Sequence, residues 1–257
     1  ALAEMVARRP GLGVLVAAGN SQRIPCHAAM DVAGGGGARE MGLFVAPDNP
    51  LVTSVEVWMP GLAEAASVSM KLTDPRGNHV SVNWPGFADL ATGARVIFPR
   101  QTAMGSGGSM ALVIIDPTRM HDGFHPAASG TWTIMVTNGS KEALRVEAWV
   151  ERSDIADKTI RRQQAYFVGD AVTHGKDRRT LASPASSPGV YGVGALRCVD
   201  GKRAAYSSGD RLQGHPLNFH YGDFGVLLPG LRTPGDHEGS SRRISGTMPL
   251  HHSSHGT

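Results

Sequence analysis

Residues 50–153 of this 257-residue chain form a series of short segments in which apolar and polar side chains alternate. In the segment 67–72, for example, Val68, Met70 and Leu72 alternate with polar residues. Alternation with a period of two places all the apolar side chains of a strand on one face. Further segments of this kind lie at 53–59, 80–84, 95–98, 110–115, 130–136 and 144–150. Roughly seven short strands separated by turn signals predict an antiparallel β-sandwich over residues 50–153.

The block also holds all four tryptophans of the chain, namely Trp58, Trp84, Trp132 and Trp149. Large aromatic side chains gather in a core, so we expect the block to have a core of its own. Between its last two strands, Asn138-Gly139-Ser140 predicts a tight hairpin turn. The same three residues are a formal glycosylation sequon, which matters only in a eukaryotic secretory setting.

A different pattern opens the chain. Residues 2–9 are expected to form a helix, and residues 13–18 are apolar without alternation, which is typical of a buried strand in a parallel sheet. The segment ends in the small residues Ala17, Ala18 and Gly19, followed by Asn20. A turn at the carboxyl end of a parallel strand is where α/β sheets bind ligands. There an Asn amide can donate to a developing oxyanion, although an ordinary Asn turn explains the residues equally well.

Several segments taken together resemble the subtilisin-like serine peptidases (subtilases). Residues 13–20 resemble the oxyanion-hole segment that ends in A-A-G-N, and 184–195 resemble the following P-A-x-x-P-x-V-x-x-V-G-A stretch. Residues 202–209 are similar to R-A-x-F-S-S-x-G, and 223–230 are similar to D-V-x-A-P-G. The string 129–136 resembles the closing strands of jelly-roll modules that accompany several subtilases. The subtilase-like segments stand in the order that the family has, whereas the jelly-roll string is inserted between 13–20 and 184–195, which departs from the simplest family members.

The resemblance implies a serine endopeptidase that cleaves protein or peptide substrates through an acyl-enzyme. It implies that Asn20 is the oxyanion-hole donor. It also implies that Ala17, Ala18 and Gly19 line one wall of the substrate pocket, for which tight turn packing is the alternative. The Asp and His of a subtilase precede the A-A-G-N segment, so we expect them in an upstream part of the same polypeptide.

The nucleophile motif G-T-S has two candidate positions. In one, Met248 stands where the family has its serine; in the other, Gly256 and Thr257 approach a serine that would come next. Neither position shows a catalytic serine within the chain. A catalytically inactive relative that binds a partner through its β-sandwich therefore remains an alternative, as does an unrelated binding protein that imitates the motifs.

The predicted fold class is α/β, a partial subtilisin-like parallel sheet with helices and an inserted antiparallel β-sandwich. Residues 1–20 and 181–257 are expected to form the discontinuous subtilase-like part, and strands near 13–18 and 189–196 are expected to pair. The sandwich would occupy 50–153. The Gly-rich range 21–49 and the charged range 154–180 are interpreted as linkers.

Composition excludes several function classes. Basic residues are scattered and the net charge is only +3, so nucleic-acid binding is not indicated. No apolar run reaches membrane-spanning length. No metal and no cofactor are expected, since the histidines His251, His252 and His255 lack acidic or Cys companions. Cys26 and Cys198 are compatible with one disulfide or with two thiols. The family resemblance favours a secreted or periplasmic location, and the residues leave a cytoplasmic one open.

Overall fold

The computed structural model describes residues 2–60, 62, 67–99, 108–120, 125–152, 164–172, 180, 185, 190–195, 197, 200 and 202–209. The chain divides into two compact units. The first unit comprises residues 1–24 and 175–257, and the second comprises residues 25–174.

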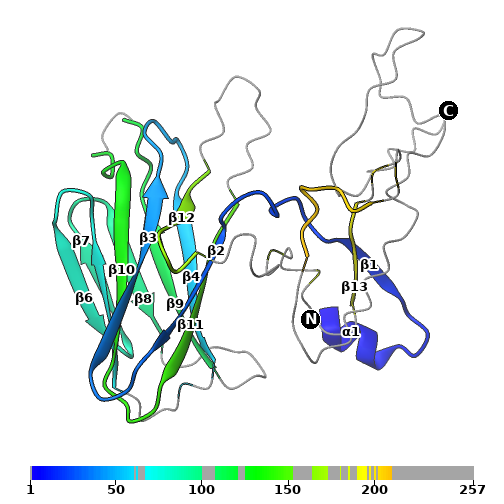
Figure 1. The fold of residues 1–257 in the computed structure, drawn as a ribbon, viewed down its shortest axis with the longest axis horizontal. Helices are drawn as coiled ribbons and strands as arrows, with labels where there is room; N and C mark the ends of the chain where they lie inside the picture. Colours follow the sequence, from blue (N-terminus) through cyan, green and yellow to red (C-terminus); the bar gives the residue numbers. More distant parts are fainter. Residues whose placement is uncertain are drawn as a thin grey trace, which may run out of the picture. The chain divides into compact units, whose positions relative to one another are not determined.

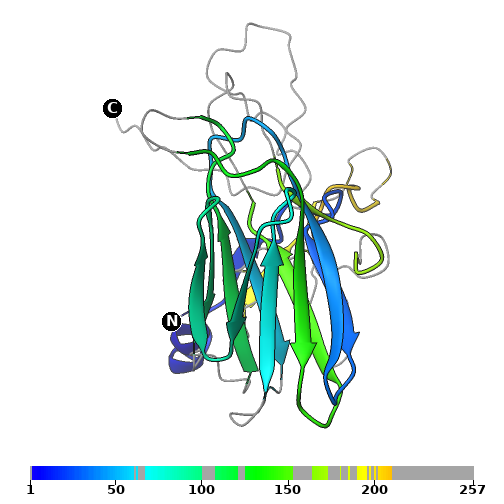
Figure 2. The same ribbon diagram turned by 90° about the vertical axis from the view of Figure 1, so that its left-hand side faces the viewer.

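The second unit consists of two antiparallel sheets, which form two layers in Figures 1 and 2. The six-stranded sheet has the order β2 (His27–Val32), β11 (Leu144–Val150), β4 (Thr53–Pro60), β9 (Gly108–Ile115), β8 (Ala94–Phe98) and β7 (Gly86–Leu90). The five-stranded sheet has the order β12 (Tyr166–Val168), β3 (Gly37–Val45), β10 (Gly130–Asn138), β5 (Val68–Thr73) and β6 (His79–Asn83). The prediction of antiparallel strands across residues 50–153 is confirmed.

Alternation in the sequence becomes alternation in burial. In β5, Val68, Met70 and Leu72 are buried while the residues between them are partly exposed. Trp132 of β10 is completely buried, and its indole N–H donates to the Ala128 carbonyl at 2.9 Å. A buried indole needs such an acceptor, because an unpaired donor costs free energy in the core. Each sheet therefore directs one apolar face into a shared core.

The pairings of the second unit are nested along the chain. β2 pairs with β11, β3 pairs with β10, and β4 pairs with β9, so each pair encloses the next. Two local pairs, β5 with β6 and β7 with β8, lie inside the nest. On one margin, β12 pairs with β3 and Val172 forms an isolated bridge to Ala28 of β2. The segment from β12 to Val172 therefore contacts strands of both sheets, β3 in one and β2 in the other.

The unit is larger than the predicted sandwich. β2 and β3 lie within 21–49 and β12 lies within 154–180, two ranges that were interpreted as linkers. The glycine run 34–37 forms the turn between β2 and β3, where Gly35 and Gly36 have φ angles of 71° and 91°. Glycine adopts such angles without strain, so a Gly-rich run can close a tight turn as well as form a flexible linker. The linker interpretation is corrected for these strands.

The first unit contains α1 (Leu2–Arg8), β1 (Val14–Ala17) and β13 (Val190–Val193). The helix ends before Pro10, and Gly11 with φ 87° follows. β1 and β13 pair in parallel with Val14 opposite Val190 and Ala17 opposite Val193, which confirms the predicted pairing of these segments.

The α/β fold class is wrong. Among the described residues, α1 is the only helix and β1–β13 is the only parallel pair, while every other sheet pairing is antiparallel. The described part of the chain is nearly all β. The α/β expectation for residues 181–257 came from the family resemblance of segments in that range, and most of these residues lie outside the described part of the chain.

Two further properties concern the cysteines and the described helices. Cys26 is buried, and burial raises the pKa of its thiol to about 11; Cys198 lies outside the described residues. None of the described helices combines the length and the apolar character that a membrane span requires.

Candidate functional site

The turn after β1 carries the residues that the sequence singled out. The Ala18 N–H donates to the Val193 carbonyl at 2.9 Å, which extends the β1–β13 pairing by one residue. Gly19 then adopts a φ of 101°, a conformation in which a side chain would be strained, so the strand ends and the chain turns. Asn20 comes next. The geometry places Asn20 at the carboxyl end of a parallel strand, as expected from the sequence.

The turn is held by a segment almost 190 residues further along the chain. The Ser208 N–H donates to the Gly19 carbonyl at 2.8 Å, and the Ser208 Oγ accepts a hydrogen bond from the Ser21 N–H at 2.9 Å. Ser208 is 1% exposed. One buried serine therefore binds the residues on both sides of Asn20.

The neighbouring serine holds the other strand of the pair. The Ala195 N–H, two residues after β13, donates to the Ser207 Oγ at 2.9 Å. The Ala204 N–H donates to the Ala195 carbonyl at 2.8 Å, and the Ser207 N–H donates to the Ala204 carbonyl at 3.0 Å. The ends of both parallel strands are thus fastened to the segment 204–208.

A polar network continues from this segment to Gln22. The Gln22 Oε1 accepts hydrogen bonds from Arg203 Nη2 at 2.9 Å and from Thr180 Oγ1 at 3.1 Å. Arg203 Nη2 also donates to the Ser207 carbonyl. At Gly209, an added Cβ would lie 2.6 Å from Arg203 Nη2, so the glycine leaves room for the guanidinium. The network gives the turn a hydrogen-bonded support in which Thr180 and Ser207 are buried.

Sequence reasoning found part of this arrangement. Ser207 and Ser208 belonged to a motif that resembled the family, but no role was predicted for either residue. Gln22 and Thr180 were missed, because both lie in ranges interpreted as linkers. Nothing in the local sequence connects residues about 160 positions apart, so only the fold could bring them together.

Of the predicted site residues, Ala17 is the last residue of β1, and Ala18, Gly19 and Asn20 lie in the turn after it. Ala18 is completely buried, while Ala17, Gly19 and Asn20 are partly exposed. Ala18 is therefore a packing residue, and the other three reach the surface. Gly256 and Thr257, like Met248, lie outside the described residues.

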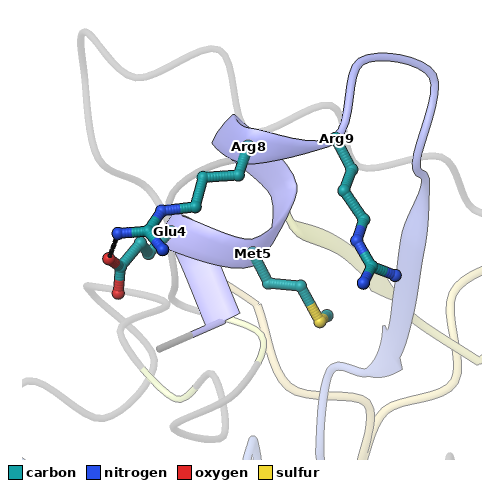
Figure 3. A pocket seen from close by; sticks show the side chains of 4 residues that line it. All are labelled: Glu4, Met5, Arg8 and Arg9. Carbon is teal, nitrogen blue, oxygen red and sulfur yellow. Dashed lines mark hydrogen bonds and ion pairs between the residues drawn. The ribbon is translucent and has the colours of Figure 1, made fainter.

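Elsewhere on the described part of the chain, the candidate sites are weaker than the turn at Asn20. No group of three His, Cys, Asp or Glu residues with metal-binding geometry occurs among the described residues. A hollow of about 280 Å³ lies beside α1 and is lined by Glu4, Met5, Arg8 and Arg9 (Figure 3). In it, Arg8 pairs with Glu4 across one helical turn, and both side chains are exposed. An exposed pair of this kind contributes little, and none of the residues around Asn20 line the hollow.

Comparison with known proteins shows a likeness to a solved structure. No family model matches the chain, and no curated protein matches it. Among solved structures, the Clostridium perfringens CspB protease matches with a TM-score of 0.58 and 15% sequence identity. The match covers 83% of this chain but 41% of that protein, so this chain spans less than half of its neighbour's length. At this identity the likeness concerns the fold, which is protease-related.

Proposed function

We propose that this chain is the carboxyl-side part of a subtilisin-like serine endopeptidase, with Asn20 as the donor to the oxyanion. The observation that carries the proposal is the position of Asn20 directly after the parallel β1–β13 pair, in a turn held on both sides by Ser208. The fold shared with part of a protease supports the same assignment.

The proposed chemistry divides between this chain and the rest of the polypeptide. An upstream part supplies the aspartate and the histidine base, and a serine after Thr257 supplies the nucleophile. The side-chain amide of Asn20 donates a hydrogen bond to the oxyanion that forms when the serine attacks the scissile carbonyl. Ala17 and Gly19 form one wall of the substrate pocket, where the lack of a large side chain allows a peptide to approach the backbone, and the buried Ala18 packs behind this wall. The substrate is a protein or peptide.

Residues 25–174 are then a jelly-roll module inserted into the catalytic domain. The support for this is the nested strand order, in which β2-β11-β4-β9 and β3-β10-β5-β6 form two facing sheets. If Met248 occupies the serine position, the protein is instead an inactive relative that uses this module to bind a partner. Labelling and cleavage by the full polypeptide distinguish the active endopeptidase from the inactive relative.

The test uses the full polypeptide that contains this chain, extended in both directions. It should react with a fluorophosphonate probe and cleave casein. The substitution Asn20→Ala should lower kcat by about 10²- to 10³-fold, the loss typical of removing one oxyanion donor. The measurements are steady-state kinetics and the thermal unfolding temperature, which should change little because Asn20 is partly exposed.

Asn83→Ala is the matched control, because Asn83 is an exposed asparagine on β6 of the other unit. This variant should keep full activity. An active enzyme that is indifferent to Asn20→Ala would remove Asn20 from the mechanism. A full polypeptide that neither labels nor cleaves would support the inactive, partner-binding alternative.

A further inference from the structure

Two adjacent buried serines hold the carboxyl ends of the two parallel strands. Ser207 accepts from the Ala195 N–H beyond β13, and Ser208 accepts from the Ser21 N–H beyond β1. Ser207 is completely buried and Ser208 is 1% exposed. The two hydroxyls are alike in chemistry and burial, but each one holds a different strand end.

The contacts of Ser208 enclose Asn20. Its backbone N–H binds the Gly19 carbonyl at 2.8 Å, and its Oγ binds the Ser21 N–H at 2.9 Å. These two hydrogen bonds fix the peptide units before and after Asn20. Those two peptide planes fix the direction of the Asn20 Cα–Cβ bond, so a buried residue behind the turn limits the positions that the side-chain amide can reach.

Such control matters because Gly19 lies immediately before Asn20. A glycine has more accessible backbone conformations than other residues, and here it adopts a φ of 101°. A donor that stabilises a transition state must be held within about 0.5 Å and 10–20° of the productive geometry. The Ser208 hydrogen bonds limit the freedom that Gly19 gives to the turn.

We infer that Ser208 is a positioning residue for the oxyanion donor Asn20, acting through the Ser21 amide and not through the substrate. The inference rests on the proposed function. Ser207, which holds the other strand, has no such link to Asn20 and contributes to stability alone.

The experiment is a double-mutant cycle in the full polypeptide. Ser208→Ala removes the acceptor for the Ser21 N–H and keeps the backbone bond to Gly19. We expect a fall in kcat of about tenfold with KM within about twofold, because a small misplacement of a catalytic donor slows the reaction strongly. In the Asn20→Ala background, Ser208→Ala should cause no further fall in kcat, since the effects of residues that act as a unit are not additive.

Ser207→Ala is the matched control, with the same loss of one buried hydroxyl one position away. Ser207→Ala should leave kcat nearly unchanged, both in the wild-type background and in the Asn20→Ala background. A second readout does not depend on activity: hydrogen exchange at the Ser21 amide should accelerate in Ser208→Ala only. Exchange at the Ala195 amide should accelerate in Ser207→Ala only.

The outcomes distinguish failure of the proposed function from failure of the role of Ser208. An inert full polypeptide, or unchanged kcat in Asn20→Ala, overturns the proposed function and this inference with it. If Asn20→Ala slows the enzyme but Ser208→Ala does not, or slows it by the same factor in both backgrounds, only the role of Ser208 is wrong. A Ser208→Ala protein that fails to fold while Ser207→Ala folds would assign Ser208 to stability and also overturn the inference.

Discussion

Asp74 shows how a single side chain can join two turns of the sandwich. It lies in the turn between β5 and β6 and is 3% exposed. Its Oδ1 accepts from the backbone N–H groups of Arg76 and Asn78, both at 2.8 Å. Its Oδ2 accepts from Asn78 Nδ2 at 2.8 Å and from Thr92 Oγ1, in the turn between β7 and β8, at 2.9 Å. Burial alone would raise the pKa of this carboxyl, but the hydrogen bonds from Asn78, Thr92 and Arg76 lower it below 3.8.

This geometry predicts a pH dependence of stability. Because the folded-state pKa of Asp74 lies below the unfolded value, the ionised carboxylate stabilises the fold at pH above about 4. The contribution is lost as the pH falls through the folded-state pKa. Asp74→Asn should therefore lower the free energy of unfolding at pH 7 and reduce its dependence on pH below 4, as measured by urea unfolding at a series of pH values. Asp31→Asn serves as the comparison, because that carboxylate is exposed on β2. Equal acid sensitivity of wild type and Asp74→Asn would contradict the prediction.

Asn138 illustrates what sequence can and cannot show about one residue. The Asn-Gly pair predicted a tight hairpin turn, and a turn does connect β10 and β11, but these strands lie in different sheets and do not pair, so the hairpin is wrong. However, Asn138 is completely buried, with its amide donating to the Val32 carbonyl at 3.2 Å and to the Glu142 carbonyl at 2.7 Å. The sequon is therefore a structural feature, because in the folded state its amide is enclosed by the turn.

At the scale of the elements, the hairpin of β7 and β8 offers a direct comparison of two phenylalanines. Phe98 on β8 is completely buried and lies 6.4 Å from Trp84 between ring centroids. Phe87 on β7 is 73% exposed. Phe98→Ala should reduce the free energy of unfolding by about 3–5 kcal/mol, the cost of a large cavity. Phe87→Ala should change it by no more than about 0.5 kcal/mol.

Chemical unfolding followed by tryptophan fluorescence measures both values. The two substitutions delete the same atoms from neighbouring strands, so each is the control for the other. Similar losses of stability would mean that the faces of this hairpin are assigned incorrectly.

Elements could be predicted wherever polarity alternated clearly. The pattern of Val68, Met70 and Leu72 identified β5, and those residues are the ones buried. β7 was missed because Gly86–Leu90 contains little alternation and follows Pro85. β3 was missed because its first half, around Arg39 and Glu40, is exposed and polar. A strand that extends beyond the core loses the signal on which such predictions depend.

For the whole molecule, the proposed division of the catalytic groups predicts an inactive chain. Without a histidine base and its aspartate, a serine hydroxyl stays protonated and is a poor nucleophile at neutral pH. The isolated 257-residue polypeptide should therefore neither react with a fluorophosphonate probe nor cleave casein. The full polypeptide is the positive control. Robust labelling of the isolated chain would contradict the proposal and direct attention to Ser245, Ser253 and Ser254.

Fold class and site were predictable only in part at this scale, because both depend on long-range partners. The parallel pairing of 13–18 with residues near 190 was predicted from resemblance, not from the residues alone. No local pattern linked Ser21 to Ser208, which lie 187 residues apart, and none showed that β2 would join β11. Patterns identify which face of an element is buried, but they do not name the element that covers it.

The nested pairing of β2 with β11 has a consequence for synthesis of the chain. His27 pairs with Trp149, so β2 emerges from the ribosome about 120 residues before its partner, a delay of about 6–24 s at 5–20 residues per second. During that time the local hairpins β5–β6 and β7–β8 can form, while β2 and β3 still lack β11 and β10. Met30, Val32, Met41 and Leu43 are all buried in the finished sandwich, and we expect them to be more exposed to solvent in the interval. The nascent chain therefore carries two unpaired, aggregation-prone strands until β10 and β11 have been synthesised. We expect the folding of the second unit to depend on chaperones more than its final stability suggests.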